Sequence, residues 1–120
     1  MTAKRSVRNT SKAGYGLEKE TAELYEGTRI GRAGNPDVVV LGADGGELVA
    51  IECEHSKRAK PPAWMLEKLT QAARLARGRR GGPIPSLLFR HKPGPGRATN
   101  AYVVRLAEDD AELVKRARQT

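Results

Sequence analysis

The spacing of apolar residues predicts a helix followed by three strands in the first half of the chain. Leu17, Thr21 and Leu24 recur at helical spacing, and Gly27 is a typical helix end. The run from Val38 to Leu41 is uniformly apolar and mostly β-branched, as expected of a strand that is covered on both faces. The predicted elements of this half are a helix at 17–26 and strands at 28–32, 38–41 and 47–53.

The second half of the chain repeats the change from helical to extended patterns. Pro61 and Pro62 stand just before an apolar stripe of helical spacing, where Pro is tolerated at a helix start. The predicted elements of this half are a helix at 63–77, strands at 86–89 and 101–106 and a helix at 109–118. The whole order, α-β-β-β-α-β-β-α, predicts an α/β protein with a central mixed β-sheet flanked by helices.

The domain organisation predicted from these patterns is simple. Residues 1–13 are polar and basic and lack periodicity, so they predict a disordered arm that gains order on nucleic acid. Residues 14–120 have the length of one ordinary domain. Asp44-Gly45 between two apolar runs is a strong hairpin signal, so the strands on either side of it are expected to pair.

The charge of the chain points to a polyanionic partner. Lys and Arg number 22 against 14 acids, which gives a formal net charge of +8, and the cations cluster in short stretches. This is the electrostatic footprint of a protein that binds the phosphate backbone of nucleic acid. The alternative is a charge kept for solubility, or an Arg bias of a GC-rich genome. Aromatic residues are few, which argues against binding of single strands by serial base stacking.

The location predicted from the sequence is cytoplasmic. The single cysteine, Cys53, cannot form an intramolecular disulfide, which suits a reducing compartment. No apolar run approaches the length of a membrane span and no signal-peptide pattern opens the chain, so no membrane partner is expected. For a phage-encoded chain the compartment would be the cytoplasm of the host.

Three acids stand where two apolar strands are predicted to end. Asp37 follows Pro36 at the start of one strand, and Glu52 and Glu54 share a face of the next strand, with Cys53 pointing into the core. Carboxylate oxygens are the ligands of Mg²⁺, and in a basic chain a magnesium site suggests phosphodiester cleavage. The alternative is that the two glutamates form the solvent face of an edge strand. Against it, the strand lacks clean alternation, which predicts burial on both sides, so the metal site is the preferred interpretation.

The chain resembles the archaeal-type Holliday junction resolvases of the PD-(D/E)-x-K nuclease superfamily over about residues 14–106. The stretch Gly14-Tyr15-Gly16-Leu17-Glu18-Lys19-Glu20 is similar to the G-x-x-x-E-R-E start of that family. Arg32-Ala33-Gly34 before Pro36-Asp37, Ile51-Glu52-Cys53-Glu54 and the later Gly81-Gly82 with Pro85 also follow its layout. The resemblance implies a restriction-endonuclease-like fold, with a metal site that Glu18 reaches from the first helix.

Two departures from the family pattern bear on the chemistry. Glu54 stands where the family has the lysine of E-x-K, which positions the attacking water. Glu54 is then expected to act as a fourth metal ligand or as the general base, and Lys57 is an alternative source of the missing cation. The loop from Arg32 to Asp37 is short and lacks a serine, so Asn35 is expected to take over a phosphate contact.

The resemblance implies a Mg²⁺-dependent endodeoxyribonuclease that resolves four-way DNA junctions by paired symmetric nicks. Mn²⁺ is expected to substitute for Mg²⁺, and a homodimer matches the two-fold symmetry of the substrate. The alternatives are a flap or restriction-like nuclease of the same superfamily, or a junction-binding protein in which Glu54 has abolished cleavage. The expected catalytic and metal-binding residues are Glu18, Asp37, Glu52 and Glu54. The expected DNA-binding residues are Arg32, Asn35, Lys57, Arg58, Lys68, Arg90, Lys92 and Arg97.

Overall fold

The computed structural model describes residues 16–30, 34–54, 56, 60–76, 82–97 and 99–119 of the chain. Their contacts group into two compact units, residues 1–60 with 114–120 and residues 61–113. The element order is a helix over residues 16–25, then β1, β2, β3, α2, β4, β5 and α3. The α/β class and the predicted order of helices and strands are therefore confirmed, and the arm at residues 1–13 lies outside the described residues.

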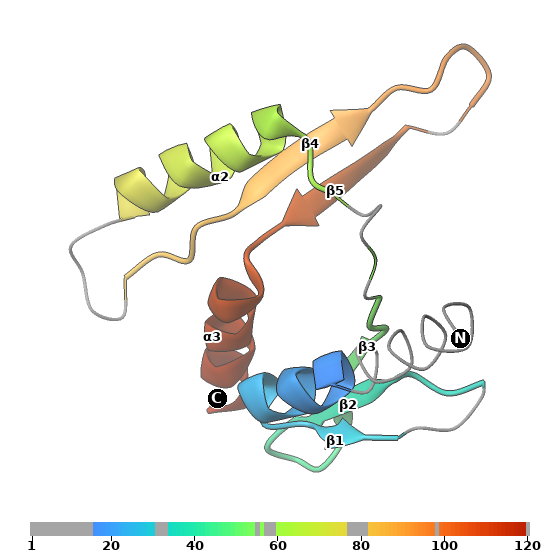
Figure 1. The fold of residues 1–120 in the computed structure, drawn as a ribbon, viewed down its shortest axis with the longest axis vertical. Coiled ribbons are helices and arrows are strands. Elements are labelled where there is room, and N and C mark those ends of the chain that lie inside the picture. Colours follow the sequence, from blue (N-terminus) through green and yellow to red (C-terminus); the bar gives the residue numbers. More distant parts are fainter. Residues whose placement is uncertain are drawn as a thin grey trace, which may run out of the picture. The chain divides into compact units, whose positions relative to one another are not determined.

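The first unit is built on a three-stranded antiparallel sheet in the order β1-β2-β3 (Figure 1). The strands are β1 (Thr28–Arg29), β2 (Val38–Leu41) and β3 (Glu47–Ile51). Val38 and Val40 on β2 are fully buried and Val39 is nearly so. The prediction that this apolar strand is covered on both faces is confirmed, because β2 is the central strand and alternate side chains point to opposite faces.

The turn between β2 and β3 forms the predicted hairpin. Gly42 N–H donates to Gly46 O at 2.7 Å, and Gly46 N–H donates to the Asp44 side chain at 2.9 Å. Gly45 takes a positive φ of 83°, a conformation that Gly adopts without steric cost. The register then places Val38 opposite Ile51. The ends of β2 and β3 that carry the candidate acids are thereby brought side by side.

The first helix ends in a Schellman motif, one residue earlier than the position of its glycine suggests. Glu26 N–H donates to Glu23 O and Gly27 N–H donates to Ala22 O, while Glu26 takes the left-handed φ of 55°. Gly27 is the predicted helix end, but the left-handed residue is Glu26, and Gly27 is needed for another reason. A Cβ at Gly27 would lie 2.8 Å from Val39 O, so the absence of a side chain lets the chain pass close to β2.

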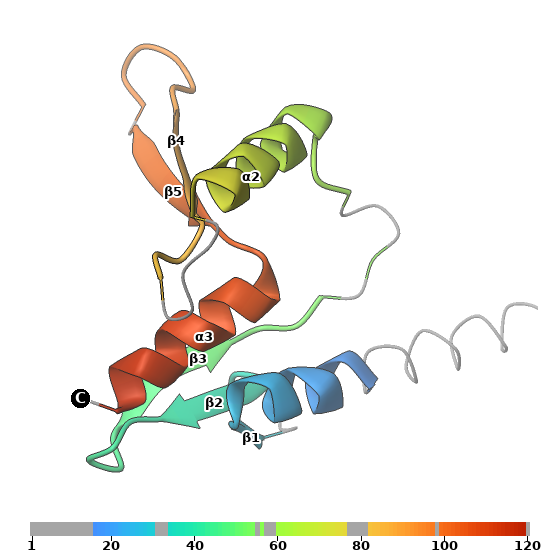
Figure 2. The ribbon, with the colours of Figure 1, turned by 90° about the vertical axis from the view of Figure 1, so that its left-hand side faces the viewer.

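The second unit consists of α2 (Ala63–Ala76), β4 (Leu87–His91), β5 (Asn100–Val104) and the start of α3 (Ala107–Arg118). The two strands form an antiparallel hairpin with α2 along one side, as both views show (Figures 1 and 2). Phe89 on β4 contacts Trp64 edge-on and stacks on Tyr102 of β5, each at 5.4 Å between ring centroids. The Trp64–Phe89 contact links the hairpin to α2, and the Phe89–Tyr102 contact joins its two strands.

Two expectations about the sheet need correction. The described strands form two antiparallel sheets and not one mixed sheet, because β4 pairs with β5 across their connecting loop. Strand β3 is also not buried on both sides, since Leu48 and Ala50 are exposed and Val49 and Ile51 only partly buried. β3 is an edge strand among the described strands, where it pairs with β2 alone. Burial of β3 therefore does not speak against exposed acids after this strand.

Candidate active site

Asp37 lies at the start of β2 and is tied to the end of the neighbouring strand. Its carboxylate Oδ2 accepts a hydrogen bond from the backbone N–H of Cys53 at 2.7 Å. On the other side, Ile30 N–H donates to the backbone oxygen of Asp37 at 3.0 Å. Asp37 is therefore fixed between the continuations of β1 and β3. Its second carboxylate oxygen makes no hydrogen bond to any other described residue.

Cys53 connects this point to the first helix. Its thiol donates to Thr21 Oγ1 at 3.5 Å, and the Thr21 hydroxyl donates to Leu17 O at 2.7 Å, within the helix. Cys53 is free and partly buried, which fits the prediction of a small inward-facing residue. The helix over residues 16–25 thus lies against the end of β3.

Glu52 and Glu54 follow β3 on the exposed side of the chain. Both side chains are exposed, whereas Cys53 between them is partly buried, so the alternation that places the two glutamates on one side is kept beyond the strand. Neither makes a hydrogen bond or ion pair with another described residue. They are accessible to a cation or to solvent.

Glu18 is held by a cation that the sequence analysis did not single out. Glu18 Oε2 and Arg29 Nε lie 3.0 Å apart, and their side chains are 17% and 37% exposed. Arg29 lies on β1 opposite Val38, the residue that follows Asp37. The sequence signal for Arg29 is its position on the strand that pairs with the start of β2, where Asp37 lies. A cation at that position is within reach of an acid on the first helix.

The four acids do not form a metal-binding cluster as their side chains are placed. Within the described residues, no group of three or more His, Cys, Asp or Glu is arranged to hold a metal ion. Asp37 is bonded to the backbone between Glu52 and Glu54, whereas Glu18 is directed to Arg29. The chemistry of the set still fits Mg²⁺, because all four donors are hard carboxylate oxygens.

The predicted DNA contacts are exposed wherever they are described. Asn35 lies beside Gly34, which has a φ of 84°, in the loop before Asp37. The described cations of the second unit are Lys68 on α2 and Arg90, Lys92 and Arg97 on the β4–β5 hairpin, and all are exposed. The remaining predicted contacts, Arg32, Lys57 and Arg58, lie outside the described residues.

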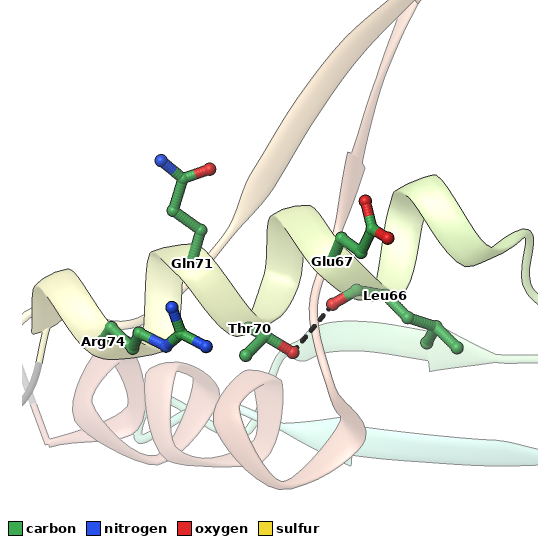
Figure 3. A pocket seen from close by; sticks show the side chains of 5 residues that line it. All are labelled: Leu66, Glu67, Thr70, Gln71 and Arg74. Atoms are coloured by element: carbon green, nitrogen blue, oxygen red, sulfur yellow. Dashed lines mark hydrogen bonds between the residues drawn. The ribbon is translucent and has the colours of Figure 1, made fainter.

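A hollow of about 460 Å³ lies along α2 in the second unit. Figure 3 shows its lining by Leu66, Glu67, Thr70, Gln71 and Arg74, with the Thr70 hydroxyl donating to Leu66 O at 2.9 Å. The hollow holds one acid and one cation and none of the predicted catalytic residues. It offers no arrangement for phosphodiester chemistry.

Comparison of the chain with protein-family models, with curated proteins and with solved structures finds no match. In the described part of the chain, no helix combines the length and the apolar composition that crossing a bilayer requires.

Proposed function

We propose that this protein is a metal-dependent, structure-selective DNA endonuclease that resolves four-way junctions. The observation that carries the proposal is the hydrogen bond from Cys53 N–H to the Asp37 carboxylate. It ties the aspartate of one strand to the backbone between two exposed glutamates of the next. This pairing of acids at adjacent strand ends, in a chain of net charge +8, suits hydrolysis of a polyanion.

The restriction-endonuclease-like fold is part of the same proposal. The order α-β-β-β-α-β-β-α and the helix that lies against the end of β3 support it. The two antiparallel sheets of the described residues differ from the single mixed sheet of that fold.

Asp37, Glu52 and Glu54 would hold Mg²⁺, with Glu18 as a further ligand once it leaves Arg29. When bound, the ion supplies charge neutralisation of the phosphate and activation of a water. Glu54 stands where a lysine is expected, and if it does not bind the ion, its carboxylate would take a proton from the attacking water as the general base. Cations at the surface would bind phosphates of the DNA backbone and position the strand.

A homodimer belongs to this proposal because a four-way junction needs two nicks related by symmetry. A two-fold assembly presents two equivalent sites to such a substrate at once. The mass of the protein in solution, with and without junction DNA, tests this part separately from cleavage.

A second candidate function is junction binding without cleavage. Two observations favour it: a carboxylate at residue 54 in place of the lysine, and the ion pair that holds Glu18 on Arg29. Such a protein would bind branched DNA through its cations and lack hydrolytic activity in any metal.

The experiment compares the protein with Asp37→Ala on labelled four-way junction, flap and linear duplex in Mg²⁺ and in Mn²⁺. Symmetric paired nicks in the junction alone, absent in the variant, are the expected result. Cutting of the flap or duplex in preference to the junction points to another nuclease activity. Tight junction binding without cleavage in either metal selects the binding protein, and unchanged cleavage by Asp37→Ala overturns the assignment of the site.

A further inference from the structure

The β4–β5 hairpin concentrates positive charge on a part of the chain that has no acid. From Lys68 to Ala107 the sequence contains no Asp or Glu. Within that stretch the exposed cations Arg90, Lys92 and Arg97 lie on β4 or on the loop that follows it. Because no carboxylate on the hairpin competes for these cations, their charge is available to an external polyanion.

The base of the hairpin is fixed on both sides. One face is held to α2 by the contact of Phe89 with Trp64, and Phe89 also stacks on Tyr102 of β5. At the end of β5, the Arg105 side chain donates to Ser86 Oγ at 2.7 Å and to Asp110 Oδ1 at 2.9 Å, which fastens the strands to the start of α3. The base is thus anchored by packing and by hydrogen bonds, and the cations lie at the opposite end.

The tip of the hairpin contains a turn that limits its conformations. Arg97 N–H donates to Gly94 O at 3.4 Å, and Gly96 has a φ of 75°. Pro95 and Gly96 therefore stand at the second and third positions of a type II turn, where each residue type is favoured. A preformed turn lowers the entropy that must be lost when a ligand is bound. The backbone of Arg97 is held in place before any partner arrives.

The face of the hairpin that points away from α2 is open. Leu88 pairs with Val103, and their exposed fractions are 67% and 50%. Arg90 pairs with Ala101 on the same face, two residues nearer the tip. The open face thus carries Arg90, and Lys92 and Arg97 lie nearer the tip. This arrangement is complementary to a nucleic-acid groove, whose walls are phosphates and whose floor is formed by base edges.

We propose that the β4–β5 hairpin enters the major groove of duplex DNA. The groove is about 12 Å wide and admits a two-stranded β-ribbon, whereas the A-form RNA major groove is too narrow and deep. Lys92 and Arg97 contact phosphates at the walls of the groove, and Arg90 contacts base edges on its floor. The choice of DNA rests on the proposed function, but the contact lies in the second unit and needs neither the acids nor a metal ion.

The first test measures the salt dependence of binding in EDTA, where cleavage is excluded. Lys92→Gln/Arg97→Gln is compared with Lys19→Gln/Lys115→Gln, which removes the same charge from exposed helical positions. Between about 50 and 200 mM salt, log K falls with log salt, and this fall should be shallower by about 2 in the hairpin variant. Each phosphate contact contributes about 0.9 to the slope, and the variant removes two. An equal effect of both variants overturns the proposal.

The second test identifies the groove by dimethyl sulfate footprinting on a duplex arm. Bound protein should protect guanine N7 in the major groove, and Arg90→Gln should remove that protection while Lys115→Gln keeps it. Protection of adenine N3 alone, which lies in the minor groove, or protection that persists in Arg90→Gln, overturns the groove assignment. A protein that passes both tests but cuts no DNA would refute the nuclease and leave this inference intact. If the protein cleaves junctions but the hairpin variant binds DNA as the wild type does, the nuclease proposal stands and the hairpin inference is refuted.

Discussion

The Asp37 carboxylate accepts a hydrogen bond of 2.7 Å from the backbone N–H of Cys53, the residue between two exposed glutamates. This bond gives Asp37 a structural duty beside its proposed role as a metal ligand. It also leaves the second carboxylate oxygen of Asp37 without a described hydrogen-bonding partner. A substitution that removes the negative charge of Asp37 and keeps an oxygen to accept the Cys53 N–H separates the structural role from the role as metal ligand.

Asp37→Asn and Asp37→Ala are expected to differ in stability and to agree in activity. The amide oxygen of Asn still accepts the Cys53 N–H, so the unfolding temperature should stay near that of the wild type. Ala leaves the N–H without its acceptor and should lower the free energy of unfolding by about 1–3 kcal/mol. Both variants lack the negative charge and should lose cleavage by about 10²-fold or more. Thermal denaturation and junction cleavage are measured side by side, and wild-type cleavage by Asp37→Asn would mean that the carboxylate is only structural.

Arg29→Gln is expected to release Glu18 for a metal ion. The ion pair lies partly in solvent, so its loss should cost only about 0.2–1 kcal/mol of stability. Affinity for Mn²⁺, measured by titration calorimetry, should rise several-fold because the guanidinium no longer competes with the cation for Glu18. The matched control is Lys19→Gln, which removes an exposed cation from the helix that carries Glu18. Equal Mn²⁺ affinity in Arg29→Gln and the wild type would remove Glu18 from the proposed metal ligands.

The elements of the fold follow from the sequence where one local pattern decides the outcome. The uniformly apolar run Val38–Leu41 is found as β2 with the predicted bounds, because burial on both faces leaves a strand few alternatives. The turn at Asp44-Gly45 is likewise found, since it depends only on neighbouring residues. Helix and strand ends elsewhere differ by a few residues, as at β3, which stops at Ile51.

The relationships within the site depend on residues far apart in the sequence, and local patterns do not contain them. The Glu18–Arg29 pair joins residues 11 apart, and the Asp37–Cys53 bond joins residues 16 apart. The first depends on how the first helix lies against β1, and the second depends on the register in which β2 and β3 pair. The left-handed conformation of Glu26 was equally hidden, because the glycine beside it offers the simpler explanation of the helix end.

Glu54→Lys is expected to preserve or raise cleavage if this chain is a working nuclease in which residue 54 is not a required ligand or base. A lysine would supply the cation that stabilises negative charge on the phosphate, and the gain could reach about tenfold. The side chain of residue 54 is exposed, so the fold tolerates the exchange. Glu47→Lys makes the same charge change at an exposed position on β3 and should leave the cleavage rate per bound junction unchanged. Loss of cleavage in Glu54→Lys, but not in Glu47→Lys, would identify Glu54 itself as a required ligand or base.

Gly27→Ala is expected to destabilise the first unit. The added Cβ would meet Val39 O at 2.8 Å and Val38 Cγ1 at 3.0 Å, and a backbone oxygen of the buried central strand cannot move aside. The cost should be about 1–3 kcal/mol, as for other overpacked sites, and should lower the unfolding temperature by about 5 °C or more.

Gly16→Ala is the matched control for that substitution, because nothing lies within 4 Å of the Cβ it would add. Ala is the better helix former, so this variant should unfold at the wild-type temperature or slightly above it. Circular dichroism melting curves of the two variants decide the comparison. Equal melting temperatures for both would mean that the chain at Gly27 does not pass as close to β2 as the structure places it. The first helix would then be free to shift on the sheet, and with it Glu18.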